Sequence, residues 1–354
     1  MPGAPDFSVS VGGSDRTGVF KDRLLKLRLV DTTGKEADQL ELEFDDRDSK
    51  IALPAHGAVI SASIGYAGKS LTALGKFTVD ETEIEGPPDT IRIRGKSSDM
   101  RASLKAHKTR HWRQMSVGAI VAQIAAEHNL QPGAHADLAG IQVDHRDQTN
   151  ESDMHFVTRL GHEHDAIASA KSGKLVLAPR GKAVSASGKS LSPVALKRSD
   201  LTRWHMVHSD RAKHGKVRAR HYDRTAAAMQ YVEAGGEDPV KVVRHVHASA
   251  AVAGQVAHAS HRRGKRKSHK IELELPGNEQ LFAGRPVQVS GVRDGINGRW
   301  ICSRVEHELD FASGGFTTKL EATVDGLDQD TGDGAQGYGG DDADNAAASG
   351  EGSE

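Results

Sequence analysis

The sequence has very little cysteine and few aromatic residues. Cys302 is the only cysteine among 354 residues, and aromatic residues make up 4% of the chain. A single thiol excludes an intramolecular disulfide framework and a multi-cysteine zinc site. No stretch approaches the run of about 20 apolar residues that a membrane-spanning helix needs. The N-terminus, Met-Pro-Gly-Ala-Pro-Asp, lacks the basic and apolar regions of a signal peptide. We therefore expect a protein that is made in a reducing cytoplasm, is not exported by the Sec route and does not insert into a membrane.

The chain also lacks an excess of charge of either sign. It has 47 Lys+Arg and 48 Asp+Glu, so its net charge of −1 does not indicate a partner. The acidic residues are unevenly placed, however. Residues 326–354 contain eight of them and no basic residue, which leaves about +7 on the preceding part of the chain. Residues 327–354 are also Gly-rich and of low complexity, and we predict that this acidic tail is disordered.

Residues 1–105 have the alternating pattern of β-strands. Leu25, Leu27 and Leu29 alternate with other residues, and after a turn at 31–34 the alternation returns at 40–44. This pattern predicts a hairpin with one buried face. Further strands are predicted at 58–66, 76–85 and 90–95. Short strands at regular spacing indicate a small barrel or sandwich.

Residues 196–326 return to the same period. Strands are predicted at 216–222, 271–275, 286–291, 299–309 and 316–324. An Ala-rich helix is predicted near 248–262, as an insertion into this second β-domain. Cys302 lies within one of the predicted strands, which indicates a small buried apolar residue rather than a nucleophile.

Between these two β-domains, residues 106–195 change character. Apolar residues at 117, 120, 121 and 124 follow Ser116 with helical spacing. A second helix is predicted within residues 148–161, where Ser152 can cap the first turn and Asp153 suits the positive end of the helix dipole. A short strand is predicted at 174–178. The fold class is therefore mainly β (β+α), with two β-domains joined by a mixed α/β middle region.

The sequence contains no strong catalytic or metal-binding motif. Its 19 histidines include pairs at 162/164, 205/208, 245/247 and 258/261, but no His-Glu-x-x-His spacing occurs. A serine nucleophile elbow is absent. Gly-Lys-Ser occurs at 68–70 and 188–190, but the glycine that a phosphate loop needs five residues earlier is Ser63 or Ala183. We therefore predict no catalytic residue, no metal site and no cofactor, and interpret the histidines as polar surface.

One basic run is a candidate interaction patch. It consists of Arg262, Arg263, Lys265, Arg266, Lys267 and, slightly apart, Lys270. Such a run can contact nucleic-acid phosphates or an acidic partner. A solvated, flexible loop accounts for it equally well.

An ordered series of short motifs resembles the phage late control gene D family, the hub proteins of contractile tails, which are similar to the hub portion of VgrG spike proteins. The motifs lie at 54–57 (Pro-Ala-His-Gly), 74–80, 86–93, 108–112, 124–130, 148–160, 275–277, 283–284, 298–301 and 305–307. The most specific is 148–160, and the resemblance covers about residues 7–326.

The resemblance implies a homotrimer in which each chain carries two barrels similar to a tail-tube subunit, at 1–105 and 196–326. Three chains then give six barrels in a ring, which can meet a sixfold tail tube on one face and a threefold spike on the other. It further implies contacts with the tube protein, the spike protein and other baseplate components, and a channel that DNA passes through. Such a protein is made and assembled in the bacterial host cytoplasm and resides in the virion tail baseplate, or in a phage-derived injection system.

A second interpretation stays open from the residues alone. The helix at 116–129 and the loop after it faintly resemble peptidoglycan-binding LysM units. A lytic baseplate module is a related alternative, although it requires a pair of carboxylates in a cleft.

Overall fold

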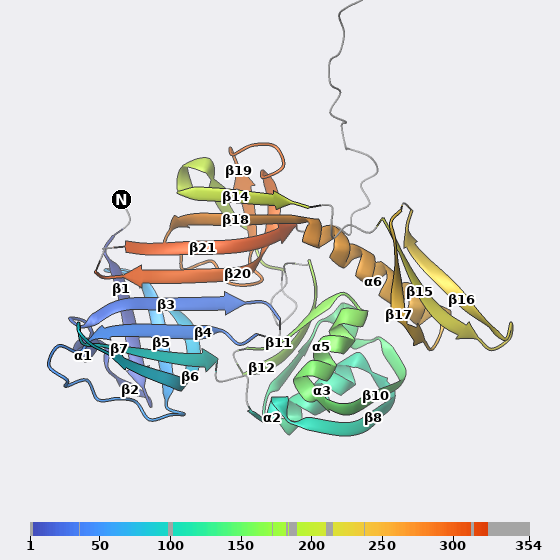
Figure 1. Ribbon diagram of the computed structural model, residues 1–354, viewed down its shortest axis with the longest axis horizontal. Coiled ribbons are helices and arrows are strands. Elements are labelled where there is room, and N and C mark those ends of the chain that lie inside the picture. The colour runs from blue at the N-terminus through green and yellow to red at the C-terminus, as the bar shows by residue number, and fades with distance from the viewer. Residues whose placement is uncertain are drawn as a thin grey trace, which may run out of the picture.

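The computed structural model describes residues 3–34, 36–97, 102–171, 173–181, 183, 190–209, 215–236, 238–312 and 315–324. The acidic tail predicted to be disordered, at 327–354, lies outside these residues. Within them the protein is mainly β, with two β-units, a mixed α/β middle module and a helix-backed small sheet (Figure 1).

The N-terminal β-unit is an antiparallel array that alternates buried and exposed side chains. Its elements are β1 (Pro5–Val11), β2 (Ser14–Asp15), α1 (Thr17–Phe20), β3 (Leu24–Thr32), β4 (Gln39–Asp45), β5 (Val59–Tyr66), β6 (Thr72–Glu85) and β7 (Thr90–Ser97). The strands pair in the order β3-β4-β7-β6-β5-β1-β2. In β4, Leu40, Leu42 and Phe44 are buried, while Glu41 and Glu43 between them are half-buried on the other face. The predicted hairpin of β3 and β4 is confirmed.

The C-terminal β-unit has its own core. It comprises β13 (Val194–Lys197), the 3₁₀ turn η1 (Arg198–Asp200), β14 (Arg203–His208), β18 (His269–Pro276), β19 (Pro286–Ser290), β20 (Gly298–Asp310) and β21 (Gly315–Val324). Trp300, Val305 and Leu320 belong to its buried cluster. Cys302 is fully buried there, as the sequence predicted, and burial raises the pKa of its thiol to about 12.

The two β-units share one sheet, which the sequence did not predict. Strand β20 pairs antiparallel with β3 from Arg304↔Thr32 to Asp310↔Lys26, so the strands join into a single 13-stranded sheet. The guanidinium of Arg28 on β3 donates to both carboxylate oxygens of Glu306 on β20, at 2.8 and 2.9 Å. Backbone hydrogen bonds and a bidentate ion pair therefore fix the relative orientation of the two β-units.

The middle module lies beside this sheet. Its elements are α2 (Ala102–Lys105), β8 (His107–Ser116), α3 (Val117–Glu127), β9 (Gln131–Ala134), α4 (Ala136–Ala139), β10 (Gln142–Ser152), α5 (Asp153–Glu163), β11 (Ala166–Lys171) and β12 (Lys174–Pro179). Strands β8 and β10 form one ladder, and β11, β12 and β9 form another. The helix predicted from residue 117 is confirmed: its apolar stripe is buried, and the Ser116 hydroxyl accepts a hydrogen bond from the Ala119 N–H at 3.1 Å.

The second β-domain contains a larger insertion than the sequence predicted. Strands β15 (Lys216–Asp223), β16 (Ala228–Gly235) and β17 (Val240–His247) form a separate three-stranded sheet that packs on α6 (Ala250–Ser268). The strand predicted at 216–222 is therefore present, but it does not join the sheet of the C-terminal β-unit. The helix predicted near 248–262 extends to Ser268, so the basic run is helical up to Lys267. Its interpretation as a flexible loop was wrong, because the helix pattern continues through the lysines and arginines, which are good helix formers.

A half-buried charge cluster ties all three parts of the chain together. The ammonium of Lys171 on β11 contacts the carboxylates of Asp31 and Asp38 from the N-terminal β-unit, the latter at 2.9 Å. Asp31 also accepts a hydrogen bond from the Ala283 N–H of the C-terminal β-unit, at 2.8 Å. Burial and the adjacent Asp31 charge raise the pKa of Asp38 to about 6, although Lys171 and the Thr32 N–H act in the opposite direction.

Replacing Asp38 with asparagine is expected to change how stability depends on pH. The pKa of about 6 in the folded state lies above the ordinary value of 3.8, so the folded protein holds this proton more tightly than the unfolded chain. This contribution to stability is present at low pH and is lost as the pH rises from about 4 to about 6. Between pH 4 and pH 6, the free energy of unfolding of the Asp38→Asn variant should therefore rise relative to that of the wild type. Above pH 6, the difference between the two proteins should stay constant. Urea unfolding at a series of pH values measures this, with Asp80→Asn as an exposed control. Parallel pH profiles of wild type and Asp38→Asn would contradict the assignment.

Candidate functional site

The segment 148–161, singled out from the sequence, contains a buried carboxylate at the start of α5. The Ser152 hydroxyl caps this helix by accepting from the His155 N–H at 3.3 Å. Asp153, the first residue of the helix, is completely buried. A carboxylate at this position is stabilised by the helix dipole, but it still needs hydrogen-bond donors to compensate for its burial.

Four side chains supply those donors to Asp153. Lys108 Nζ and His128 Nε2 contact one carboxylate oxygen at 2.5 and 2.8 Å, and Arg110 Nη2 and Gln148 Nε2 contact the other at 2.5 and 2.7 Å. Burial acts to raise the pKa of Asp153. The hydrogen bonds from Gln148, Lys108 and His128 and the charge of Arg110 more than offset it and lower the pKa to about 2. Asp153 is therefore ionised at neutral pH.

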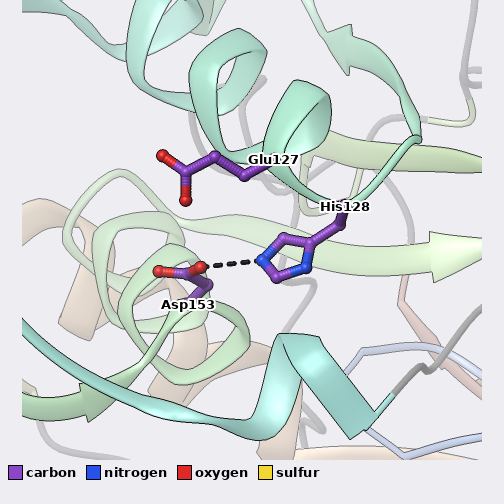
Figure 2. A group of neighbouring side chains, drawn as sticks. All are labelled: Glu127, His128 and Asp153. Atoms are coloured by element: carbon purple, nitrogen blue, oxygen red, sulfur yellow. Dashed lines mark hydrogen bonds and ion pairs between the residues drawn. The ribbon is translucent and has the colours of Figure 1, made fainter.

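Glu127, His128 and Asp153 form the one group of three metal-ligand side chains that lie within 4.8 Å of one another in the described part of the chain (Figure 2). Two cations already bridge the carboxylates: Lys108 and Arg110 each contact both Glu127 and Asp153. A divalent ion at this point would lie next to two positive charges, and its ligand atoms are already used. We interpret the group as an ionic joint between β8, α3, β10 and α5.

An aromatic pair packs over this joint. The Arg110 guanidinium lies 4.4 Å from the Trp112 ring, whose indole N–H donates to Gln148 Oε1 at 3.3 Å. The Trp112 and Phe156 rings stack with centroids 5.7 Å apart. The motifs at 108–112 and 148–160, which carry the family resemblance, thus meet in one place. The sequence did not predict the roles of Lys108, Arg110 and His128, because nothing local marks them as partners of Asp153.

Within the described ranges, none of the histidine pairs predicted from the sequence lies with a third metal-ligand side chain in a group that could hold a metal ion. His205 faces Glu272 at 3.5 Å, and His208 contacts His269 with 2.8 Å between ring nitrogens. Burial lowers the pKa of His164, His247 and His261. These imidazoles are therefore held toward the neutral form.

A groove of about 1130 Å³ runs between the middle module and the inserted sheet. Its lining includes Arg146, Arg159 and five histidines: His107, His155, His162, His245 and His247. Arg146 pairs with Glu163 at 3.0 Å and Arg159 with Glu151 at 2.9 Å, whereas Arg263, which also lines the groove, donates to the carbonyl oxygen of His162. The groove is a candidate contact surface rather than a reaction site.

The six residues of the basic run do not form one exposed patch. Arg262 and Arg266 pair with the buried carboxylate of Asp165, and Arg263 donates to the carbonyl oxygen of His162. Lys265 is exposed, and the side chain of Lys267 lies outside the described atoms. Lys270 is on β18 and pairs with Glu321 at 2.8 Å and Glu272 at 3.3 Å. The long separation between Asp165 and residues 262–266 explains why the sequence did not indicate this pairing.

None of the helices that the structure describes has the length and apolar character needed to cross a bilayer.

Comparison with known proteins identifies the chain's relatives. The family described as phage tail baseplate hub (GPD) matches residues 66–312. The protein named "Probable baseplate hub protein" of Escherichia phage P2 is 33% identical over 362 residues, covering 90% of this chain and 93% of that protein. The tail protein from Neisseria meningitidis MC58 has a TM-score of 0.70 at 12% identity, covering 92% of this chain and 98% of that one.

A wider structural likeness extends to injection systems. An E. coli component of the type VI secretion system, described as structurally similar to T4 bacteriophage tail proteins, has a TM-score of 0.57 at 12% identity, with 90% of this chain and 77% of that one covered. Because its identity is low, this likeness shows the fold alone. The family resemblance inferred from the ordered motifs is thus confirmed, and the chain belongs to the phage tail baseplate hub (GPD) family.

Proposed function

We propose that this baseplate hub protein acts as a homotrimer that joins a sixfold tail tube to a threefold spike and directs tail assembly, without catalysing a reaction. The observation that carries the proposal is the single sheet through β3 and β20, because it makes the two β-units of one chain a rigid pair. Three rigid pairs can present six similar surfaces to a tube, whereas two β-units on a flexible linker would not hold that spacing.

A closed ring also needs unlike contact surfaces at the two ends of each subunit. Along its main path, the described sheet ends in β2 at one edge and β14 at the other. Edge strands carry unpaired backbone groups and are natural places for a neighbouring subunit to add. In such a ring the enclosed channel would pass DNA, and the spike and other baseplate components would bind the remaining faces, including the groove beside α5. Assembly in the host cytoplasm and residence in the virion baseplate follow from that role.

The absence of a reaction is proposed on chemical grounds. The buried carboxylate of Asp153 already accepts hydrogen bonds from four side chains, and the thiol of Cys302 is buried with a raised pKa. Neither group is available as an acid, base or nucleophile.

Mass photometry of the purified full chain, alone and with its tube protein, tests the proposal. The expected result is a species at three times the 37.8-kDa chain mass, either alone or once the tube protein is added. A monomer that neither trimerises nor binds the tube protein would count against the trimeric hub. A pull-down on purified cell-wall sacculi tests the alternative of a peptidoglycan-binding module, and saturable binding there would favour that role instead.

A further inference from the structure

The inserted sheet of β15, β16 and β17 has one exposed face that is rich in large apolar side chains. Its inner face packs on α6 through Val217, Ala219 and Ala234. Side chains that alternate with these lie on the opposite side, which holds five of the eleven large apolar residues exposed in the described ranges. Exposed apolar residues that gather in one place mark interaction sites more often than scattered ones do. We call this surface the outer sheet face; it consists of Arg218, Arg220, Tyr222, Met229, Tyr231, Val242 and Val246.

Arg220 lies in the middle of the outer sheet face. The strand register sets it beside Tyr231 on β16 and Val246 on β17. Its Nη2 donates to a backbone carbonyl oxygen of β17 at 2.7 Å, and its buried Nε has no hydrogen-bond partner among the described residues. No carboxylate in the described ranges pairs with Arg220, whereas the neighbouring Arg218 contacts Glu233. Tyrosine and arginine are the residues that most often dominate protein–protein binding. The outer sheet face therefore suits a partner surface that combines apolar residues with carboxylates.

The turn between β6 and β7 has this combination. Ile84, next to the last residue of β6, is 65% exposed. Glu85 and Asp89 are exposed carboxylates on either side of the turn, and neither pairs with a cation in the described ranges. Pro87 and Pro88 lie between them, and each proline ring fixes the backbone φ angle, which limits the freedom of the turn. We call Ile84, Glu85, Pro87, Pro88 and Asp89 the acidic turn.

The outer sheet face and the acidic turn lie at opposite ends of the subunit. Figure 1 shows β15, β16 and β17 at the right end of the longest axis. Strand β7 runs in the same direction as β3, so the acidic turn before it lies at the left end (Figure 1). The two surfaces cannot meet within one chain. Two outer sheet faces in contact would set arginine against arginine, which is unfavourable. A head-to-tail contact between unlike ends avoids this and can repeat around a closed ring.

We propose that the outer sheet face of one subunit binds the acidic turn of a second copy of this chain, the next subunit of the ring. The inference rests on the trimeric hub proposed above and adds one contact to those at the sheet edges. Ile84 of one subunit packs among Tyr231 and Val246 of its neighbour. Glu85 and Asp89 supply the carboxylates that Arg220 lacks within its own chain.

Charge reversal with rescue tests the contact, with the trimer fraction of the full chain read by mass photometry at one chain concentration. Tube protein is added if the wild type needs it to trimerise. Arg220→Glu should lower the trimer fraction at least about fivefold, because like charges then face each other. Glu85→Arg combined with Asp89→Arg should do the same. All three changes together should bring the trimer fraction back to within about twofold of the wild type, a recovery that misfolding of either variant would not give.

Arg113→Glu is the matched control, because Arg113 is an exposed strand arginine of the middle module with no carboxylate partner in the described ranges. It should leave the trimer fraction unchanged, and circular dichroism checks that every variant is folded. Trimers that persist in Arg220→Glu and in the Glu85/Asp89 variant would overturn the inference and leave the trimeric hub standing. Loss of trimer without recovery in the combined variant would overturn it as well. A wild-type chain that stays monomeric with its tube protein would overturn both proposals.

Nucleic acid is the competing occupant of the outer sheet face, because tyrosine rings beside arginines can stack on bases. Fluorescence anisotropy with a labelled single-stranded oligonucleotide separates the two. We expect no difference in oligonucleotide binding between the wild type and Arg220→Glu. Tight binding that Arg220→Glu abolishes, with the trimer fraction unchanged, would assign the outer sheet face to nucleic acid and overturn the subunit contact.

Discussion

Asp153→Ala is expected to destabilise the middle module by about 3–5 kcal/mol, the range typical of removing one partner from a buried ionic group. The substitution deletes the acceptor of Lys108, Arg110, His128 and Gln148 in one step. Glu127 can still pair with the lysine and the arginine. The buried Nε2 of His128 loses its acceptor, whereas Gln148 Nε2 keeps the Glu151 carbonyl oxygen at 2.9 Å. A buried polar atom without a hydrogen bond is costly.

Hydrogen exchange of the amides in α3 and α5 measures this loss within the module concerned. Asp147→Ala is the matched control, because Asp147 is a mostly exposed carboxylate that pairs with His145 at 3.1 Å. Its loss should cost no more than about 1 kcal/mol.

The contribution of Asp153 to stability should also depend on pH, with a defined sign. The pKa of Asp153 is about 2 in the folded protein and 3.8 ordinarily, so its contribution is complete above pH 4 and is lost as the pH falls toward 2. Equal effects of the two substitutions would mean that Asp153 is not the centre of the joint.

Local patterns predicted most of the elements but not how they meet. Alternation at 24–45 and helical spacing at 117–124 are signals within a few residues, and both elements were confirmed. Ser152 and Asp153 were recognised as a helix start for the same reason. The network around Asp153 depends on residues from 108 to 153, whose register only the folded chain fixes. The resemblance to tail hub proteins could be recognised from the sequence because the order of many weak motifs along the chain is itself sequence information.

The basic run is a case in which a local sequence pattern did not predict the environment of its side chains. A row of lysines and arginines at 262–267 is a surface pattern by composition, yet Arg266 is buried against Asp165. The partner lies about a hundred residues earlier in the chain, and no periodicity connects them. The pairing of β3 with β20 was missed for a related reason. Alternation shows that a strand has a buried face, but the choice of its neighbour depends on chain topology.

Leu309→Ala should destabilise the N-terminal β-unit, although residue 309 belongs to a strand of the C-terminal half. Leu309 is fully buried and lies opposite Leu27 in the β3–β20 pairing, within the same apolar cluster as Leu42. Removing a buried leucine side chain costs about 2–5 kcal/mol through lost transfer energy and the cavity that is left. Hydrogen exchange is expected to quicken first in β3, β4 and β7.

Leu320→Ala is the matched control, because Leu320 is equally buried but packs in the C-terminal cluster. It should quicken exchange first in β18 and β19, with a similar loss of stability. Comparing the two variants tests whether β20 contributes side chains to both apolar clusters, Leu309 to the N-terminal one and Val305 to the C-terminal one. If Leu309→Ala instead quickened hydrogen exchange only in the C-terminal strands, the two β-units would not share apolar packing where β3 pairs with β20. A rigid pair of β-units would then rest on polar contacts such as the backbone hydrogen bonds, the Arg28–Glu306 pair and the Asp31–Ala283 hydrogen bond, without shared apolar packing. That is a weaker basis for holding six units at fixed spacing.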